Sequence, residues 1–491
     1  MISQNPGQRR SMIHHLRSFL TVLIVQGVTL AGDALPSPPP NIVLIYVDNL
    51  GYGDLGCYGN SEIQSPRLDK LADQSVRCTD FYVVSPGCTP SRGALLTGRY
   101  PRRNGLTFQL ATTENWTGQG LPHRERILPE YLADAGYTTA CFGKWNIGFA
   151  PGSRPTERGF DEFLGCRSGN IHYFKHTYHG DYDIFKGLHR HHVTGYSTDI
   201  FADAACDFIR RTADQPFFLY LPFNAPHYVS RVNTVPDETE KPEWHVPGRY
   251  LERYGWPADD STEKHRYLAL LTALDDAVGR VLDTLSETGQ DNNTLVMFIS
   301  DMGAILRPTH GLGVASNAPF RSGAPFMYEG GVRVPAMFRW PGQLAPGTTC
   351  TEMLSHMDVL PLCLNAAGID PPAPAVSQGS DASDEQPSVP HILDGRNPLP
   401  ALTGAARSPH RFLVFAYGRD VAVRQGHLKA VRPGARGPWE LYDLEADPAE
   451  QHDLAAKRPQ DLAKLQATFQ QWSEDTKQDA SVAVRDIPAR K

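Results

Sequence analysis

From residue 40 onward, short apolar runs alternate with amphipathic runs along most of the chain. Short apolar runs are typical of strands buried on both faces, and the amphipathic runs between them have the spacing of helices with one apolar face. This alternation predicts an α/β fold with a large, mostly parallel central sheet flanked by helices on both faces. The expected strands are 42–47, 137–142, 217–223 and 295–299, and the expected helices include 66–74 and 261–288.

The chain has 491 residues, which is too long for one hydrophobic core because single cores rarely grow beyond about 250 to 300 residues. Residues 371–390 are rich in Pro, Ser, Ala and Asp without periodicity, which indicates a linker or a long surface loop. We therefore expect an α/β domain over 40–370 and a small α+β domain over 391–491. The small domain should hold a short antiparallel sheet and a closing helix, with strands at 412–415, 421–424 and 427–431 and the helix at 459–472.

Residues 1–34 have the pattern of a secretory signal peptide. Arginines precede an apolar run at 19–31, and small residues follow where a signal peptidase would cut. The alternative, an uncleaved anchor, is disfavoured because the run is shorter than the roughly 20 residues that span a bilayer. We expect an exported protein, periplasmic or secreted, with no membrane span after cleavage. Export makes disulfides possible, and the spacing of the eight cysteines leaves their pairing open.

The charge of the chain limits its partners. Lysine and arginine number 47 against 54 aspartates and glutamates, which gives a formal net charge of -7. Such a chain has no bulk positive field to hold a nucleic acid or an anionic membrane. An anionic substrate must therefore be bound by a few local cations.

Polar side chains follow the predicted strands at the points where the strands end. These side chains are Asp48 and Asn49, Lys144 and Asn146, His227, and Asp301. Ligand sites of open α/β sheets lie beyond the carboxyl ends of the strands, so acids, a lysine and a histidine there predict a metal-assisted anion site. Taken singly, each has an ordinary explanation as a turn cap, a solvated lysine or a hydrogen-bonded histidine. Their convergence on one sheet edge favours a functional role.

The segment 88–98 reads CTPSRGALLTG and predicts a short helix. Thr89 suits an N-cap, Pro90 the first helical position and Gly98 the helix end. Cys88 would then lie at the positive end of the helix, where anions bind favourably. The alternative for Cys88 is a disulfide.

These residues resemble the signature of the formylglycine-dependent, arylsulfatase-like sulfatase family, which has the alkaline phosphatase superfamily fold. In that signature the cysteine, here Cys88, is converted to formylglycine by a maturation enzyme. Further segments are similar to the family, so that the resemblance covers roughly residues 40–455: 41–60, 143–148, 216–227, 300–303, 328–342 and 441–448.

The resemblance implies a hydrolase of sulfate monoesters, either aryl sulfates or sulfated carbohydrates. It implies one Ca²⁺ or Mg²⁺ ion bound by Asp48, Asn49, the formylglycine made from Cys88, and Asp301. The implied catalytic residues are Cys88, Arg92, Lys144 and His227. Among these, Arg92 and Lys144 would bind the sulfate and the hydrated aldehyde, while His227 would bind the substrate and donate a proton to the leaving alcohol.

The sequence departs from the family at four positions. Asn49, Asn146, Met302 and Ala324 stand where the family has an aspartate, a histidine, an asparagine or glutamine, and a lysine. Asn49 can still offer an oxygen to the metal, whereas the thioether of Met302 is a soft ligand with little attraction for a hard cation. Asn146 cannot act as the base that expels sulfate, a loss that typically costs about 10² to 10⁴ in rate. Ala324 removes a cation from the region of the sulfate and leaving group.

We therefore expect a sulfatase-like hydrolase whose turnover is slowed or blocked when sulfate is released. Three alternatives stay open. Other residues could replace the lost base and cation, or the protein could be an inactive binder of sulfated glycans that keeps Arg92 and Lys144 as an anion clamp. A hydrolase of a related phosphoester is the third, because the same helix start suits either anion.

Six of the 18 histidines fall between His172 and His192, interleaved with tyrosines. Such a density could bind a transition metal or line a sugar-binding rim. Because the spacing of possible ligands is irregular, we favour a solvated insertion loop.

Overall fold

The computed structural model describes residues 38–110, 119–178, 180–229, 243–307, 312–372, 392–477, 480–481 and 484–485. The predicted signal peptide lies outside these residues, as does most of the predicted linker at 371–390. Among the residues that the structure describes, no helix is long and apolar enough to cross a membrane.

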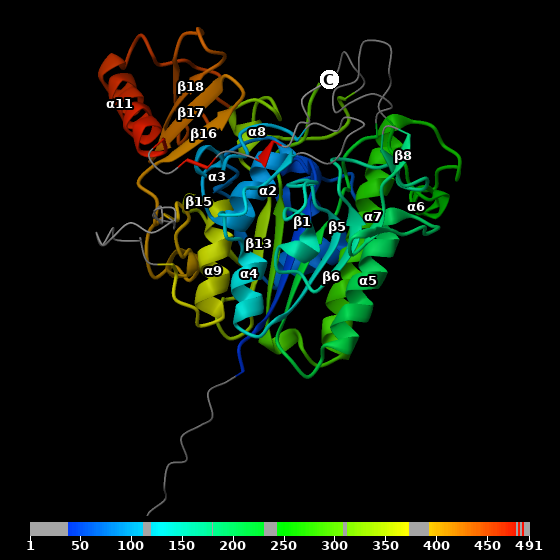
Figure 1. Ribbon diagram of the computed structural model, residues 1–491. Helices are drawn as coiled ribbons and strands as arrows, with labels where there is room; N and C mark the ends of the chain where they lie inside the picture. The colour runs from blue at the N-terminus through cyan, green and yellow to red at the C-terminus, as the bar shows by residue number, and fades with distance from the viewer. Residues whose placement is uncertain are drawn as a thin grey trace, which may run out of the picture. The chain divides into compact units, whose positions relative to one another are not determined.

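A ten-stranded sheet forms the centre of the molecule (Figure 1). Only β9 and β13 run antiparallel to their neighbours in it, so the sheet is mostly parallel, as the sequence predicts. In spatial order its strands are β10 (His189–Arg190), β9 (Phe185–Lys186), β6 (Glu162–Cys166), β5 (Thr138–Lys144), β11 (Phe217–Pro222), β1 (Asn41–Val47), β12 (Thr294–Ser300), β13 (Ala336–Arg339), β2 (Val76–Cys78) and β14 (Thr348–Cys350).

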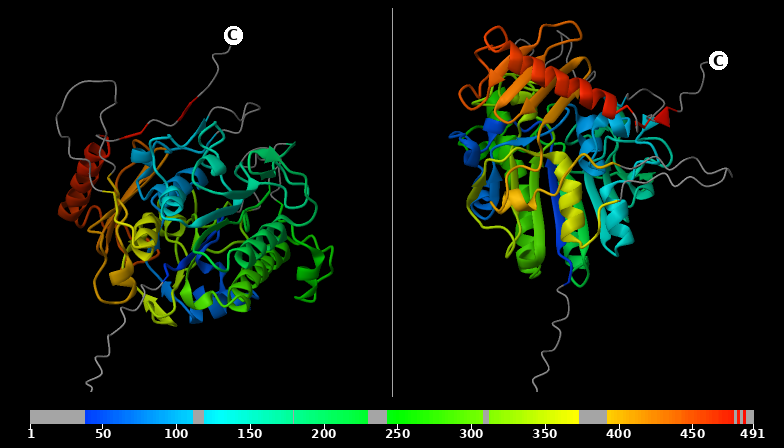
Figure 2. Two further views of the ribbon diagram at one scale, coloured as in Figure 1. Left: turned by 60° about the horizontal axis from the view of Figure 1, so that its bottom comes forward. Right: turned by 90° about the vertical axis from the view of Figure 1, so that its left-hand side faces the viewer.

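Each face of this sheet buries its own hydrophobic core because successive strand residues point to opposite faces. In β1, Val43 and Ile45 belong to one core, whereas Ile42 and Leu44 belong to the other. The first core is covered by α1 (Pro66–Asp73), α5 (Ser197–Arg211) and α7 (Glu263–Glu287). The second is covered by α2 (Cys88–Thr97), α4 (Leu128–Asp134) and α9 (Val359–Ala366). Figure 2 shows the helices on both sides of the sheet, which confirms the predicted fold class.

A four-stranded antiparallel sheet follows near the C-terminus, in the order β16 (Leu413–Tyr417), β17 (Asp420–Gln425), β18 (Leu428–Arg432) and β19 (Glu440–Asp443). The helix α11 (Pro459–Asp475) covers one face (Figure 2). Leu465 and Trp472 of this helix belong to one hydrophobic cluster with Val423 of β17. On the other face Phe415 packs on Tyr82, which lies outside the small sheet in strand β3. The predicted small sheet and closing helix are thereby confirmed. The boundaries 40–370 and 391–491 stay predictions.

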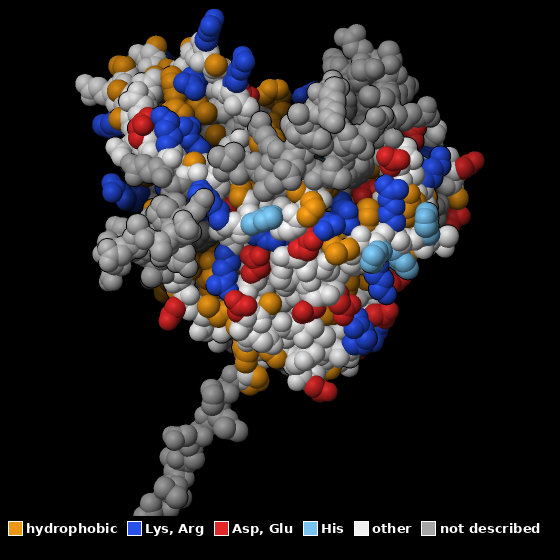
Figure 3. Space-filling view, viewed as in Figure 1, with side chains coloured by type: hydrophobic (Ala, Val, Ile, Leu, Met, Phe, Trp, Pro, Cys, Tyr) orange, Lys and Arg blue, Asp and Glu red, His pale blue; other side chains and the backbone are white. Residues whose placement is uncertain are grey.

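Shorter elements complete the described chain. The two-stranded pairs are β3 (Phe81–Tyr82) with β15 (Leu354–Ser355), β4 (Gln119–Gly120) with β20 (Val484–Arg485), and β7 (Thr177–Tyr178) with β8 (Asp181–Tyr182). The short helices are α3 (Pro101–Asn104), α6 (Gly248–Glu252), α8 (Glu329–Val332) and α10 (Leu399–Leu402). On the face shown in Figure 3, acidic and basic side chains are interspersed around the lower half, in keeping with the nearly balanced charge.

A buried charge cluster joins the small sheet to α8. The ammonium of Lys429 on β18 lies 2.8 Å from a carboxylate oxygen of Glu329 and 3.0 Å from one of Glu450. Lys429 and both glutamates are fully buried. Arg333 lies 3.2 Å from the same Glu329. Because a buried charge is costly without a partner, this cluster fixes how the small sheet docks.

Replacing Lys429 by methionine should destabilise the protein strongly. The change leaves Glu450 without its cation and Glu329 with Arg333 alone, so we expect the free energy of unfolding to fall by about 3 to 5 kcal/mol. Urea unfolding followed by circular dichroism measures it. Lys464→Met is the matched control, because Lys464 pairs with Asp461 at the surface, and it should change stability by less than about 0.5 kcal/mol. Equal effects of the two variants would show that the cluster has no special role.

Candidate active site

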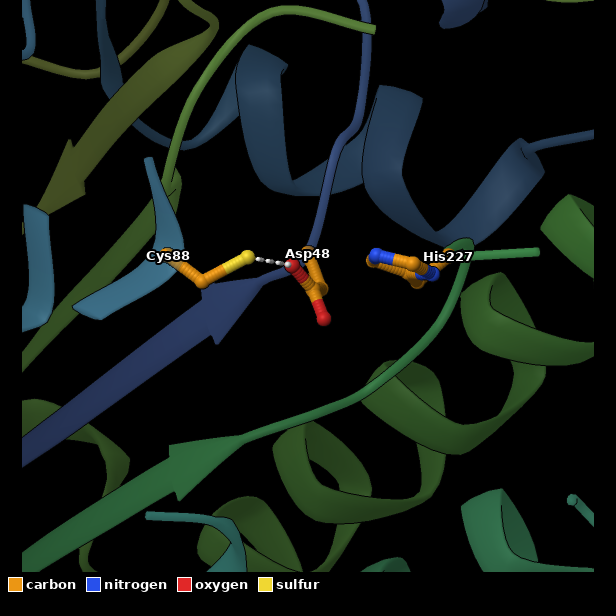
Figure 4. A group of neighbouring side chains, drawn as sticks. All are labelled: Asp48, Cys88 and His227. Carbon is orange, nitrogen blue, oxygen red and sulfur yellow. Dashed lines mark hydrogen bonds between the residues drawn. The ribbon is translucent and has the colours of Figure 1, made fainter. Parts of the chain in front are cut away.

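The polar residues predicted at the strand ends meet at the carboxyl edge of the central sheet. Asp48 follows β1, Lys144 ends β5, His227 lies beyond β11 and Asp301 follows β12. Cys88, the first residue of α2, approaches the same edge. The metal-ligating atoms of Asp48, Cys88 and His227 all lie within 4.8 Å of one another. Figure 4 shows Cys88 and His227 on opposite sides of Asp48, with the Cys88 thiol donating to Asp48 Oδ1 at 3.5 Å.

Cys88 begins α2 in a different way from the sequence prediction. The N-cap is Gly87, in extended conformation, and not Thr89, which lies in the first turn. A side chain at position 87 would collide with the ring of Tyr417, because a Cβ there would lie 2.6 Å from Tyr417 Cε2. Gly98 ends the helix in the left-handed region with φ 64°, as predicted. Cys88 is therefore at the positive end of a ten-residue helix.

The thiol of Cys88 is buried, and all eight cysteines are free in the structure. Burial and the neighbouring Asp48 carboxylate raise the pKa of the Cys88 thiol well above its usual range. An unmodified Cys88 is consequently a poor nucleophile at neutral pH, because the thiolate is the reactive form. The structure gives no support to the alternative in which Cys88 forms a disulfide.

Two cations and two carboxylates are paired behind Cys88, and all four are fully buried. Lys144 Nζ lies 2.5 Å from Asp48 Oδ2, and Arg92 Nη2 lies 2.8 Å from Asp301 Oδ2. Asp301 also accepts the backbone N–H of Asn49 at 3.0 Å. Burial and the Asp48 carboxylate raise the pKa of Asp301 to about 7. The sequence prediction that these residues converge agrees with this geometry, while their roles stay proposals.

The amide of Asn49 is free to bind a ligand. Asn49 is 5% exposed, has φ 64°, and neither its Oδ1 nor its Nδ2 has a hydrogen-bond partner within the described residues. A buried amide without partners is costly, and its oxygen is a suitable ligand for a hard cation. Together with the carboxylates of Asp48 and Asp301, this donor set fits Ca²⁺ or Mg²⁺.

Hydrogen bonds hold both the ring and the backbone of His227. Its Nδ1 lies 2.6 Å from the carbonyl of Tyr228, and because a carbonyl only accepts, Nδ1 carries the proton. The hydroxyl of Tyr173 donates to the carbonyls of Asn224 at 3.0 Å and of His227 at 2.9 Å. Burial, followed by the charge of Lys144, lowers the pKa of His227 to about 3. The imidazole is therefore neutral at pH 7 in this structure.

The departures from the family lie around the same site. Asn146 has φ 57°, and its Oδ1 accepts the hydroxyl of Thr89 at 3.0 Å. Met302 and Ala324 line a cavity of about 80 Å³ in front of Cys88 and His227. Sequence reasoning missed further residues that line this cavity, because they come from loops without periodicity and from the small sheet: Gln109, Tyr228, Ile305, Arg307, Leu312 and Tyr417.

The histidine-rich segment 172–192 forms short hairpins beside this site. His172 stacks on His245 with ring centroids 4.0 Å apart, and His192 stacks on Tyr182 at 4.3 Å. In the part of the chain that the structure describes, the only group of three or more His, Cys, Asp or Glu side chains that could hold a metal is Asp48, Cys88 and His227. Among the described histidines of the segment, His172, His176 and His192 contact other rings, whereas His189 and His191 are exposed.

Known proteins are similar to this chain in fold and in sequence. Ps i-CgsB, solved in complex with k-i-k-neocarrahexaose, matches with a TM-score of 0.76 and 29% identity over 90% of this chain and 95% of that chain. Human arylsulfatase A is 34% identical over 487 residues, which cover 87% of this chain and 85% of the relative. The N-acetylgalactosamine-6-sulfatase of Canis lupus familiaris is 32% identical over 445 residues, which cover 86% of this chain and 77% of the relative.

The sulfatase family model matches residues 40–369. These residues include the central sheet, the helix that begins at Cys88 and the buried ion pairs at the carboxyl edge of the sheet. The chain belongs to the sulfatase family. Membership supports a sulfatase-like function, that of a sulfuric ester hydrolase.

Removing the hydroxyl of Tyr173 should loosen the loop that carries His227. Tyr173→Phe removes the side-chain donor of the His227 carbonyl, while the Asn224 carbonyl keeps the backbone N–H of His227, so we expect the free energy of unfolding to fall by about 1 to 3 kcal/mol. Urea unfolding measures the change. Tyr131→Phe is the control, because within the described chain the Tyr131 hydroxyl makes no hydrogen bond. Unchanged stability in Tyr173→Phe would contradict this role.

Proposed function

We propose that the protein hydrolyses sulfate monoesters with a formylglycine made from Cys88 and a Ca²⁺ or Mg²⁺ ion, and that its turnover is impaired. The observation that supports this most is the position of Cys88 at the start of α2, within reach of Asp48 and His227, in a chain of the sulfatase family. When present, the formylglycine supplies a hydrated aldehyde as nucleophile, and the divalent cation supplies positive charge for the sulfate oxygens.

The residues of the chain bind and orient the ester. Asp48, Asn49 and Asp301 would hold the cation, and their oxygen atoms suit it. Arg92 and Lys144, which face Asp301 and Asp48, would direct N–H groups at the sulfate and at residue 88. Because both cations are fully buried, their field acts in a medium of low dielectric and is stronger than at the surface.

His227 would protonate the leaving alcohol. Its ring is neutral in the structure, with the proton on Nδ1 directed to Tyr228. A bound sulfate ester brings negative charge next to the ring, which opposes the effect of Lys144 and raises the pKa of His227. We propose that His227 takes up its second proton together with the substrate and delivers it from Nε2.

Impaired turnover follows from two substituted positions. Asn146 reaches the first turn of α2 through Thr89, but an amide has no proton to exchange near neutral pH and cannot expel sulfate as a base. Met302 lines the cavity beside Cys88 where an oxygen ligand would complete the metal site. Attack on the ester should therefore be less affected than release of sulfate.

The names of relatives suggest the substrate class. Relatives include N-acetylgalactosamine-6-sulfatase and arylsulfatase A, and the solved Ps i-CgsB was crystallised with k-i-k-neocarrahexaose. We propose a sulfated carbohydrate or an aryl sulfate as the substrate, an exported location, and a maturation enzyme as a partner of Cys88. Should Cys88 stay a thiol, we propose instead a non-catalytic binder of sulfated glycans, which the loss of a base at position 146 favours.

Peptide mass spectrometry on residue 88 tests this function directly. We expect the exported protein to carry an aldehyde at this position, and incubation with 4-nitrophenyl sulfate should add the mass of a sulfo group that persists on the peptide. An aldehyde peptide that stays unchanged while 4-nitrophenol accumulates would show a fully active sulfatase. An unmodified Cys88 would contradict hydrolysis and support the glycan binder.

Asn146→His should raise the multiple-turnover rate. Histidine tolerates the left-handed backbone of this position, and a ring there can accept the proton that Asn146 cannot. We expect at least a roughly 10-fold higher steady-state release of 4-nitrophenol, with a new pH dependence near the ordinary histidine pKa of about 6.5. Asn146→Gln is the control, since it keeps an amide. Identical pH profiles for the two variants would show that the missing base does not limit turnover.

A further inference from the structure

The cavity in front of Cys88 has a wall that the motifs and the strand ends predict only in part. Met302, Ile305 and Leu312 give this wall an apolar character. Ala324, where the family has a lysine, belongs to the same wall. The residues at 302 and 324 therefore leave this wall without polar side chains where the proposed function places the sulfate and the leaving group.

Arg307 is the one cationic side chain that lines this cavity in the described chain. Arg92 and Lys144 lie deeper, each in contact with an aspartate. Arg307 is partly exposed, and it makes no ion pair with a carboxylate within the described residues. Its guanidinium is thus available to an anion in the cavity.

The backbone of Arg307 is held in place. Its N–H donates to the carbonyl of Leu312 at 2.7 Å, and the N–H of Leu312 donates back at 3.1 Å. Three residues earlier, the carbonyl of Ala304 accepts the N–H of Ala324 at 3.2 Å, and the side chain of Asn317 bonds both polar backbone groups of Ala304. The segment that carries Arg307 is therefore attached to the segment that carries Ala324.

The charge of Arg307 also reaches the residues next to the proton donor. Tyr228, adjacent to His227, lines the same cavity, and the guanidinium opposes the burial that raises the pKa of the Tyr228 hydroxyl. Arg307 therefore lines the same cavity as His227 and Tyr228. An arginine here can give two parallel N–H donors to sulfate oxygens, which a lysine cannot.

We infer that Arg307 supplies the substrate-binding cation that Ala324 lacks, so that the positive charge of this wall has moved from position 324 to position 307. The inference rests on the proposed function, because it assigns a sulfate ester to the cavity. Arg307 binds the sulfate group and stabilises the charge that develops on the leaving oxygen. The wall around it is otherwise apolar, so Arg307 is the specificity-determining contact there.

Relocating the charge tests the inference. The variants are Arg307→Gln, Arg307→Lys, Ala324→Lys and the double variant Arg307→Gln with Ala324→Lys, all in the full chain. We expect Arg307→Gln to weaken binding of inorganic sulfate by roughly 10- to 100-fold in calorimetric titration, because a hydrogen bond to a charged group is lost. Arg307→Lys should lose less sulfate affinity than Arg307→Gln. The double variant should bind sulfate at least about 10-fold more tightly than Arg307→Gln alone. Release of 4-nitrophenol from 4-nitrophenyl sulfate should follow the same order.

The control is Arg211→Gln, which removes one positive charge at the surface, where Arg211 pairs with Glu162. It should leave sulfate affinity unchanged, and thermal unfolding of every variant shows whether the fold is retained. Sulfate affinity in Arg307→Gln equal to that of the parent protein would overturn the inference. So would a double variant that fails to recover affinity while remaining folded.

The two hypotheses fail in different ways. If the parent protein releases no 4-nitrophenol but its sulfate affinity depends on Arg307 and is recovered at position 324, the proposed hydrolysis fails and the role of Arg307 stands. If the parent protein is active and Arg307→Gln matches it in both sulfate affinity and kcat/KM, hydrolysis stands and the role of Arg307 is wrong.

Discussion

Two buried ion pairs at the carboxyl edge of the central sheet, Lys144 with Asp48 and Arg92 with Asp301, determine much of the arrangement of this protein. The four residues come from the ends of β5, β1 and β12 and from α2. An unpaired charge at full burial costs several kcal/mol, so these segments can meet only in the register that pairs the charges. The same pairs place two cations and two oxygen ligands around Cys88. The ion pairs that stabilise the sheet edge are therefore the same groups that surround Cys88.

Under the proposed function, the substitutions around this centre would slow turnover more than they weaken the binding of an anion. The buried cations, the two aspartates and Cys88 are all present, and the unpaired amide of Asn49 still offers an oxygen. What has changed lies on the outer wall and beside the helix start, at Asn146, Met302 and Ala324. The groups proposed to hold a sulfate are therefore retained, whereas an amide stands at position 146, where a proton-exchanging group is expected.

The small sheet takes part in the site as well as in the fold. Tyr417, at the end of β16, lines the cavity and lies against the backbone of Gly87 at the start of α2. Lys429 on β18 fixes this docking through Glu329 and Glu450. Because the helix start that carries Cys88 has a glycine at this contact, the tyrosine ring can approach without collision. The cavity is thus completed only when the two sheets are packed together.

The sequence by itself determined the central strands β1, β5, β11 and β12 and the helices α1, α2, α7 and α11, because apolar periodicity is local. It also determined the cluster of Asp48, Lys144, His227 and Asp301, because parallel strands end at a common edge. It misassigned the N-cap of α2 to Thr89, whereas the structure has Gly87 at the cap, where Tyr417 of the small sheet leaves no room for a side chain. Only the tertiary structure decided that Arg307 and Tyr417 line the cavity and that the amide of Asn49 lacks partners. These facts depend on how loops and sheets distant in sequence pack together, and no local pattern of residues records that packing.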